Sequence, residues 1–146
     1  MTTGGLRLRT GAVTVLLGPV ELRRQVLSEL DEATARCALG HLASGVHRLA
    51  PDDDEPVASR VQLLERLAAA GCPLLLADRP TAGLSGSDRR CVLVALRALS
   101  RTGTAVLTDD VDPVAALAVA DAGLRVTPDG ALVSDELTGP AADVEP

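Results

Sequence analysis

Aspartate side chains at the ends of two successive predicted strands are the residues best placed for chemistry. Asp78 ends one apolar run, and Asp109, Asp110 and Asp112 follow the next. Ligands of open α/β sheets bind beyond the carboxyl ends of the strands, and carboxylate oxygens are preferred ligands of divalent metals. One hypothesis is therefore a divalent-metal phosphotransfer site built from Asp78, Asp110 and Asp112.

The same aspartates also have a structural explanation. Residues 110–113 read D-V-D-P, which is an ordinary start for a helix. Arg79 stands among the carboxylates, and no nucleophile or general base is evident beside them. We therefore favour structural roles for these carboxylates over metal binding.

Alternating strands and helices are predicted to position these residues. The predicted strands are apolar or β-branched runs, at residues 6–9, 12–17, 74–77, 104–107, 124–127 and 131–134. The predicted helices have apolar side chains at helical spacing, at residues 20–33, 57–70, 87–100 and 113–122. Strands that alternate with helices call for a parallel sheet covered on both faces. The last two strands, joined by P-D-G, predict a closing hairpin.

Three segments are less regular. Residues 35–49 leave open whether a strand is present. Residues 51–56 form an acidic loop bounded by prolines, which lacks the glycine and the alternating spacing of a calcium loop and is interpreted as a solvated connection. Residues 135–146 are rich in proline and acidic residues and are predicted to be disordered.

Composition narrows the function classes. The chain has 146 residues, the length of one domain, and no Phe, Tyr or Trp that could stack on a nucleobase. Its net charge is -6 without a basic cluster, which argues against nucleic acid as a partner. No apolar run has the length of a membrane span, and the N-terminus lacks the apolar core of a signal peptide. We expect a cytoplasmic protein without direct membrane insertion.

The cysteines and histidines match no metal site. Cys37, Cys72 and Cys91 fit no ligand spacing and are expected to be buried free thiols. His41 and His47 have no Cys or carboxylate at ligand spacing and are expected to be surface or half-buried side chains.

Four segments resemble the ATPase domain of ABC transporters. PLLLADRPTAGLSGSDRR (residues 73–90) resembles that family's Walker B and D-loop, GTAVLTDDVDPVAALAVAD (103–121) its switch-histidine region, and DGALV (129–133) its terminal hairpin. GAVTVLLGPVELRRQVLSEL (11–30) can be laid without gaps on its P-loop strand and helix. The resemblance implies a P-loop NTPase-like α/β fold, with a mostly parallel sheet, helices on both faces and a C-terminal β-hairpin.

The phosphate-binding part of that family is matched incompletely. A P-loop, G-x-x-x-x-G-K-[ST], holds phosphates with backbone N–H groups, a Lys and a hydroxyl. Gly18 matches the first glycine, but Arg23 stands at the second. Arg24 then stands at the Lys and Gln25 at the Ser or Thr. Without the glycines, we expect residues 19–24 to be helical and to fill the phosphate space.

The hydrolytic part is also matched incompletely. Walker B supplies an Asp for Mg²⁺ and then an acid that orients the attacking water. Asp78 matches the Asp, but Arg79 stands at the acid and cannot accept a proton at physiological pH. On that topology Arg23, Arg24 and Arg79 lie close together, which would suit a small anion. We expect instead that nearby acids neutralise them. These acids are Glu21, Asp78 and Asp109.

The remaining motifs complete the comparison. In the D-loop region Asp88 matches, but Ser85 replaces an Asp. In the switch region Val111 replaces the His, and Asp112 matches the next position. The short segment between Gln25 and Asp78 holds no LSGGQ signature and no room for the helical subdomain that carries it.

We interpret residues 1–134 as a degenerate core of this type and residues 135–146 as an acidic tail. The predicted function is a non-catalytic interaction or regulatory subunit without a cofactor. Its predicted partner is a protein, either a full-length ABC ATPase or a second copy of this chain. One alternative is a residual site for ATP and Mg²⁺, and the other is the phosphotransfer enzyme. The residual site would use Gly18, Arg24, Gln25 and Asp78.

Overall fold

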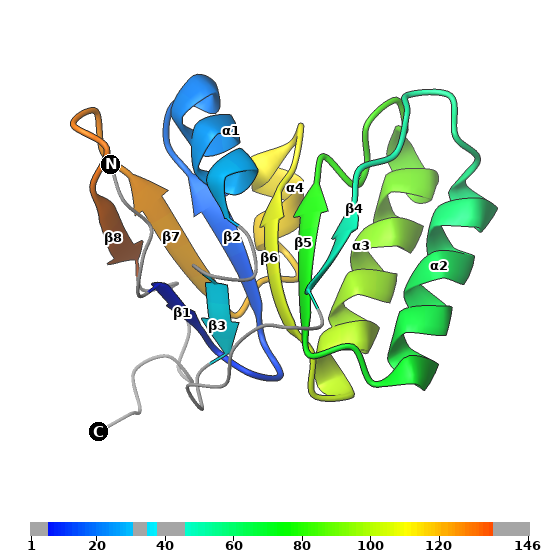
Figure 1. The fold of residues 1–146 in the computed structure, drawn as a ribbon. Helices are drawn as coiled ribbons and strands as arrows, with labels where there is room; N and C mark the ends of the chain where they lie inside the picture. Colours follow the sequence, from blue (N-terminus) through cyan, green and yellow to red (C-terminus); the bar gives the residue numbers. More distant parts are fainter. Residues whose placement is uncertain (1–5, 31–34, 38–45, 136–146) are drawn as a thin grey trace.

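The computed structural model describes residues 6–30, 35–37 and 46–135. At its centre is a six-stranded sheet with the strand order β4-β5-β6-β2-β7-β8 (Figure 1). Its strands are β2 (Val13–Leu17), β4 (Val46–Leu49), β5 (Leu74–Asp78), β6 (Ala105–Asp109), β7 (Ala122–Val126) and β8 (Leu132–Asp135). Neighbouring strands are parallel, except that β7 and β8 form an antiparallel hairpin. The predicted α/β fold with a mostly parallel sheet and a C-terminal hairpin is confirmed.

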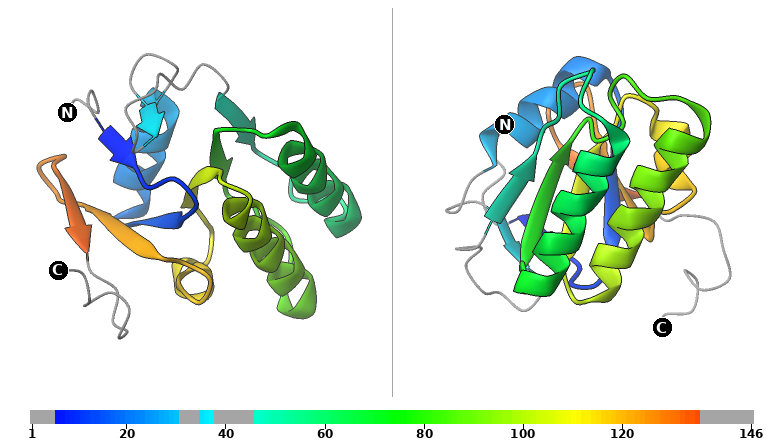
Figure 2. Two further views of the ribbon diagram at one scale, coloured as in Figure 1. Left: turned by 90° about the horizontal axis from the view of Figure 1, so that it is seen from below. Right: turned by 90° about the vertical axis from the view of Figure 1, so that its right-hand side faces the viewer.

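Helices cover both faces of this sheet (Figures 1 and 2). One face carries α1 (Val20–Glu29). The other carries α2 (Val57–Ala70), α3 (Gly86–Arg101) and α4 (Pro113–Leu117). A small parallel pair, β1 (Leu6–Leu8) and β3 (Ala35–Cys37), lies on the face of α1 (Figure 2). This second sheet was not anticipated from the sequence.

Two aliphatic cores follow from the alternation of side chains along the strands. In β5, Leu75 and Ala77 are buried against α2 and α3, whereas Leu74 and Leu76 are buried on the side of α1. The helix predicted at 57–70 has the predicted bounds, and Gly71 ends it at a φ of 75°. Left-handed glycine is the usual helix terminator at this position.

Five expectations need correction or lie outside the described residues. The helix predicted at 113–122 ends at Leu117, because Asp121 N donates to Val13 O and Ala122 already belongs to β7. Cys72 is buried as expected, but Cys91 is exposed, because it lies on the outer face of α3. The side chain of Cys37, the whole of His41 and the predicted tail beyond Asp135 lie outside the described residues.

The segment left open at residues 35–49 contributes two strands, β3 and β4. β4 lies at the edge of the main sheet, where His47 is exposed. Among the residues that the structure describes, no helix is long and apolar enough to cross a membrane.

Candidate functional site

The candidate site is the strand-end crevice, where β2, β5 and β6 end beside the first turns of α1. β2 leads through Gly18 and Pro19 into α1, which begins at Val20. Residues 20–25 are therefore helical, as expected for a segment that lacks the glycines of a P-loop. Arg23 N already donates to Pro19 O at 3.0 Å, so this N–H is used within the helix. The backbone here does not form a loop that could wrap around an anion.

Gly18 has a structural reason to be glycine. Its φ is 113°, in the region that residues with a side chain rarely adopt. A Cβ atom at this position would lie 2.5 Å from Val126 O in the neighbouring strand β7. The close approach of the two strands therefore requires Gly18 whether or not a phosphate binds.

Arg23 turns its side chain back into the crevice. Its Nε donates to Asp109 Oδ1 at 2.7 Å, and its Nη1 donates to Gly18 O at 2.9 Å. The side chains of Arg23 and Asp109 are only 9% and 2% exposed. Burial raises the pKa of Asp109 above its ordinary value, and the hydrogen bond and charge of Arg23 offset this only in part. One buried ion pair thus ties α1 to the ends of β2 and β6.

Asp78 and Arg79 lie at the outer side of the crevice. Asp78 is the last residue of β5 and pairs in register with Asp109. Arg79 adopts a left-handed φ of 50° and donates its backbone N–H to Asp109 O at 2.7 Å. Its Nε lies 3.5 Å from Asp78 Oδ1, and the two side chains are 42% and 35% exposed. An exposed pair at this distance contributes little to stability.

The expected neutralisation is confirmed for Arg23 and is weak for Arg79. Arg24 has no ion pair with any residue that the structure describes. Arg24 and Arg79 border two adjoining hollows of about 240 and 480 Å³. Gln25 lines the larger hollow, where its Nε2 donates to Glu29 Oε2 at 3.2 Å. The crevice therefore keeps two arginines that are not fully paired.

The aspartates after β6 bind protein donors. Asp110 is 1% exposed, and its Oδ1 accepts the backbone N–H of Thr81 at 3.0 Å, while Thr81 Oγ1 donates to its Oδ2 at 2.7 Å. Asp112 Oδ1 accepts Ala115 N at 3.0 Å at the start of α4, and its Oδ2 pairs with Arg89 Nη1 at 3.0 Å. Val111, between them, is 46% exposed.

Among the described residues, metal ligands do not gather at this edge of the sheet. Within residues 6–30, 35–37 and 46–135, no group of three His, Cys, Asp or Glu residues could hold a metal ion. Asp78, Asp110 and Asp112, the set considered from the sequence, are all in this part of the chain. Asp110 and Asp112 instead fix the loop after β6 through their hydrogen bonds.

The D-loop-like segment leads into α3. Ser85 is the N-cap residue of α3, although its side chain makes no capping hydrogen bond. Asp88 lies exposed in the first turn, where its backbone N–H donates to Ser85 O at 3.2 Å. Both residues therefore lie at the start of α3, close to the start of the helix that the sequence predicted at residues 87–100.

Arg60 holds the rim of the crevice and was missed from the sequence. Its side chain is fully buried in α2. Within the described part of the chain its guanidinium donates to backbone carbonyls, namely Asp52 O at 2.9 Å, Glu55 O at 2.8 Å, Pro80 O at 2.9 Å and, more weakly, Asp53 O at 3.5 Å. A Cβ atom on Gly83 would lie 2.0 Å from Asp53 O, so the two loops are in close contact. The acidic loop is thus anchored by its backbone, whereas the sequence predicted a simple solvated connection.

A sequence signal for Arg60 does exist. Arg60 occupies the same helical face as Val57, Leu64 and Leu67, at a spacing at which apolar residues face the core. A charged residue on an apolar stripe must find partners when it is buried. That spacing predicts burial, but it does not reveal which carbonyls Arg60 binds.

Comparisons with known proteins support the fold. No protein-family model and no curated protein sequence matches the chain. Among solved structures, one similar chain is the ATP-binding subunit of an ABC transporter. The match covers 81% of this chain and 75% of that chain, with a TM-score of 0.53 and 11% sequence identity. The α/β fold of this protein is therefore similar to that of an ABC ATP-binding subunit.

Proposed function

We propose that this chain is a non-catalytic interaction or regulatory subunit built on an ABC ATPase-like fold. The observation that carries the proposal is the Arg23 side chain, which lies between Gly18 O and the Asp109 carboxylate. In the family that the sequence resembles, a glycine at this position leaves the space to nucleotide phosphates. Here a buried ion pair occupies the space.

The residues that would activate water are also replaced. Arg79 follows Asp78 at the end of β5, and a guanidinium has no proton-accepting role at physiological pH. Val111 stands at the position of the switch histidine. Hydrolysis needs a group that orients or deprotonates the attacking water. We therefore expect no ATPase activity, even if a nucleotide were to bind.

A protein partner is the natural target of such a domain. The similar solved structure is a subunit of an ABC transporter, and a subunit assembles with other chains. By analogy of fold, the partner of this chain would be a full-length ABC ATPase or a second copy of itself. This step rests on fold-level analogy, because folds host many functions.

One observation favours a second candidate, a residual site for ATP. Arg24 and Arg79 border both hollows of the crevice, and Arg24 has no ion pair within the described part of the chain. Guanidinium groups recognise phosphates well. This candidate requires that the phosphates bind outside the space taken by Arg23, with Asp78 beside Mg²⁺.

Calorimetric titration with ATP and Mg²⁺, together with a thermal melt in the same buffers, separates the two candidate functions. The interaction role predicts no heat of binding and no change in Tm. A residual site predicts stabilisation by about 2.7 kcal/mol at a ligand concentration one hundred times the Kd. That stabilisation would be lost in Arg24→Ala. It would be kept in Arg66→Ala, a matched change on the exposed face of α2. This pair of results would contradict the interaction role.

A further inference from the structure

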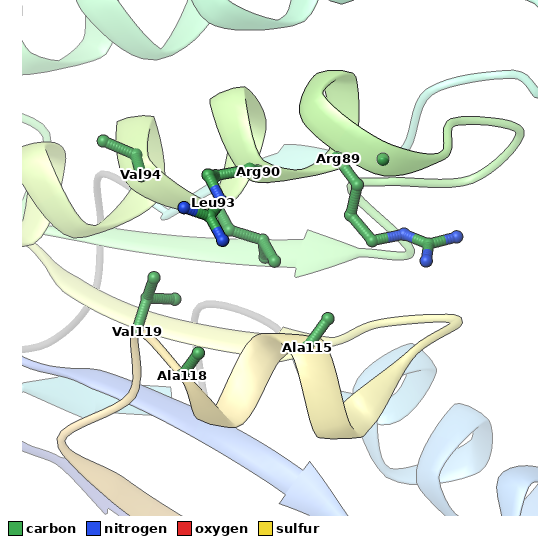
Figure 3. Close-up of a pocket in the computed structure, with 8 residues that line it drawn as sticks. Arg89, Arg90, Leu93, Val94, Ala115, Ala118 and Val119 are labelled. Carbon is green, nitrogen blue, oxygen red and sulfur yellow. The ribbon is translucent and has the colours of Figure 1, made fainter.

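A groove between α3 and α4 lies on the face of the sheet opposite α1, away from α1 and its ion pair with β6. It encloses about 440 Å³, and Figure 3 shows side chains of α3 and α4 facing each other across it. Its apolar lining consists of Leu93, Val94, Ala115, Ala118 and Val119. We call this feature the α3–α4 groove. Its volume would accommodate several aliphatic side chains of a partner.

Two ion pairs fix the walls of the groove. Arg89 Nη1 lies 3.0 Å from Asp112 Oδ2 at the start of α4, and Arg101 Nη2 lies 3.0 Å from Asp121 Oδ1 beyond its end. Each pair joins α3 to the chain segment that contains α4. The groove is therefore formed before any partner binds, which reduces the entropy lost on association.

The surface along α3 is positively charged. Arg90, Val94 and Arg97 are exposed and lie on one face of the helix, since their spacing is four and then three residues. Neither Arg90 nor Arg97 has an ion pair with any residue that the structure describes. In a protein with a net charge of -6, two unpaired arginines beside an apolar groove form a local exception.

Apolar side chains are also left exposed around the groove. Val94 is 53% exposed, and Val114, on the adjoining turn of α4, is 78% exposed. Val94 lines the groove, and Val114 directly precedes Ala115, which also lines it. Apolar surface rimmed by polar residues is typical of interaction sites.

We propose that the α3–α4 groove binds an acidic amphipathic helix of a partner protein. The apolar face of the helix enters the groove, as in other helix-in-groove complexes. Its acidic side chains, placed seven residues apart, face Arg90 and Arg97, which are separated by about 10.5 Å along α3 at 1.5 Å per residue. This proposal rests on the interaction role proposed above. It adds the surface that binds the partner and the chemistry of that partner.

A fluorescein-labelled peptide tests the proposal directly on the full chain. The probe is a designed helical peptide with Leu on one face and Glu on both flanks, and its matched analogue has Lys in place of Glu. The anisotropy of the label reports binding, because the bound peptide tumbles more slowly than the free peptide. A label is needed, since the protein has no aromatic residue whose fluorescence could report binding. We expect the acidic peptide to bind with a micromolar Kd and the basic peptide to bind at least about ten-fold more weakly, because charge complementarity selects partners.

Variants locate the peptide on the groove. Ala118→Glu places a carboxylate in the lining, and Arg90→Glu reverses one of the unpaired charges, so each should weaken binding of the acidic peptide by about ten-fold or more. Arg66→Glu, the same charge change on the exposed face of α2, should leave the Kd unchanged. Far-UV circular dichroism of each variant confirms that the fold is intact.

Three results would overturn the proposal. The first is an acidic peptide that fails to bind, or binds Ala118→Glu as tightly as the unaltered chain. The second is sedimentation as a dimer that Ala118→Glu dissociates, because the groove would then bind a second copy. The third is a chain that binds phosphatidylserine vesicles but not the peptide, and that loses vesicle binding in Arg90→Glu. The surface would then be a membrane-binding surface. The ATP titration is independent of these measurements, so the role and the groove can fail separately.

Discussion

The strand-end crevice and the α3–α4 groove use arginine in opposite ways. In the crevice, Arg23 is buried and paired with Asp109, and nearby Asp110 is buried and bonded to Thr81. Along α3 beside the groove, Arg90 and Arg97 are exposed and have no ion pair with any described residue. The buried charges of the crevice are paired within the protein, whereas these two exposed charges beside the groove remain available to another molecule.

The difference indicates where this fold is structural and where it is available for binding. A buried charge is costly unless it is paired, so removing one partner in the crevice should destabilise the protein. An exposed charge costs little, so changing it in the groove should leave the fold intact. Stability measurements can therefore test whether the two regions differ in this way. Circular dichroism in urea is the suitable method, because the chain has no aromatic fluorescence.

The largest effect is expected at Arg60, which holds the rim of the crevice. Arg60→Met should lower the free energy of unfolding by about 3 kcal/mol or more, because the buried Pro80 carbonyl and the partly buried carbonyls of Asp52 and Glu55 lose a charged donor. The control is Arg66→Met on the exposed face of the same helix, with an expected change below about 0.5 kcal/mol. Equal effects of the two variants would show that the guanidinium of Arg60 does not anchor the loops.

The ion pair inside the crevice should show strong coupling. Arg23→Met should cost about 3 kcal/mol, because it leaves the buried Asp109 carboxylate without its cation. The double variant Arg23→Met/Asp109→Val should recover most of this loss, since apolar replacement of a buried pair is often nearly neutral. A double variant whose loss is the sum of the two single losses would contradict the coupling.

Two aspartates should give pH dependences of opposite sign. The pKa of Asp109 is raised, so the folded state retains its proton more strongly than the unfolded state does. As the pH rises, Asp109 loses its proton first in the unfolded state, at about 3.9, and later in the folded state, at the raised pKa. Across this pH range the unaltered chain should therefore lose stability relative to Asp109→Asn. Unfolding free energies of the two proteins across this range test the sign.

Asp121, whose ion pair with Arg101 fixes one wall of the groove, provides the matched case. Burial alone would raise its pKa, but hydrogen bonds from Arg101 and from Val13 N outweigh burial and lower the pKa. The stabilisation from Asp121 should be present above a pH of about 3.9 and be lost as the pH falls through the lowered pKa. Asp121→Asn should therefore cost about 1 kcal/mol at neutral pH and less in acid. A constant difference between the two proteins would refute this assignment.

The smallest effect is expected in the groove. Arg90→Glu and Ala118→Glu should each change the free energy of unfolding by less than about 0.5 kcal/mol, because both positions are exposed. These variants should still weaken binding of the acidic peptide. A large loss of stability in either one would make the groove structural, like the crevice, and would remove the contrast between the two regions.

Local patterns predicted the elements of this fold closely. The helix at 57–70 has the predicted bounds, because apolar spacing marks its body and Gly71 marks its end. The helix predicted at 113–122 was too long, because pairing of Ala122 with Thr14 in β2 overrides a local preference of alanines for helix. The strands β3 and β4 had no clear local signal at residues 35–49.

The candidate site was predicted less completely. The types and spacing of Gly18, Arg23 and Arg79 indicated that the glycines and the acid of the family's pattern are missing. The helical backbone after Pro19 and the pairing of Arg23 with Asp109 agree with that prediction. The carbonyls that Arg60 binds and the Thr81 donors that Asp110 binds were not predicted, because they lie in loops whose positions depend on the tertiary fold.

The alternation of strands and helices, the aliphatic core and the helical start after Gly18 could all be predicted from local sequence. These properties depend on residues close together in the chain, through periodicity and backbone preference. Which charges are paired and which remain available depends instead on the tertiary fold. Ion pairs such as Arg23 with Asp109 join residues far apart in the chain, and whether a charge such as Arg90 stays exposed depends on which elements pack around it.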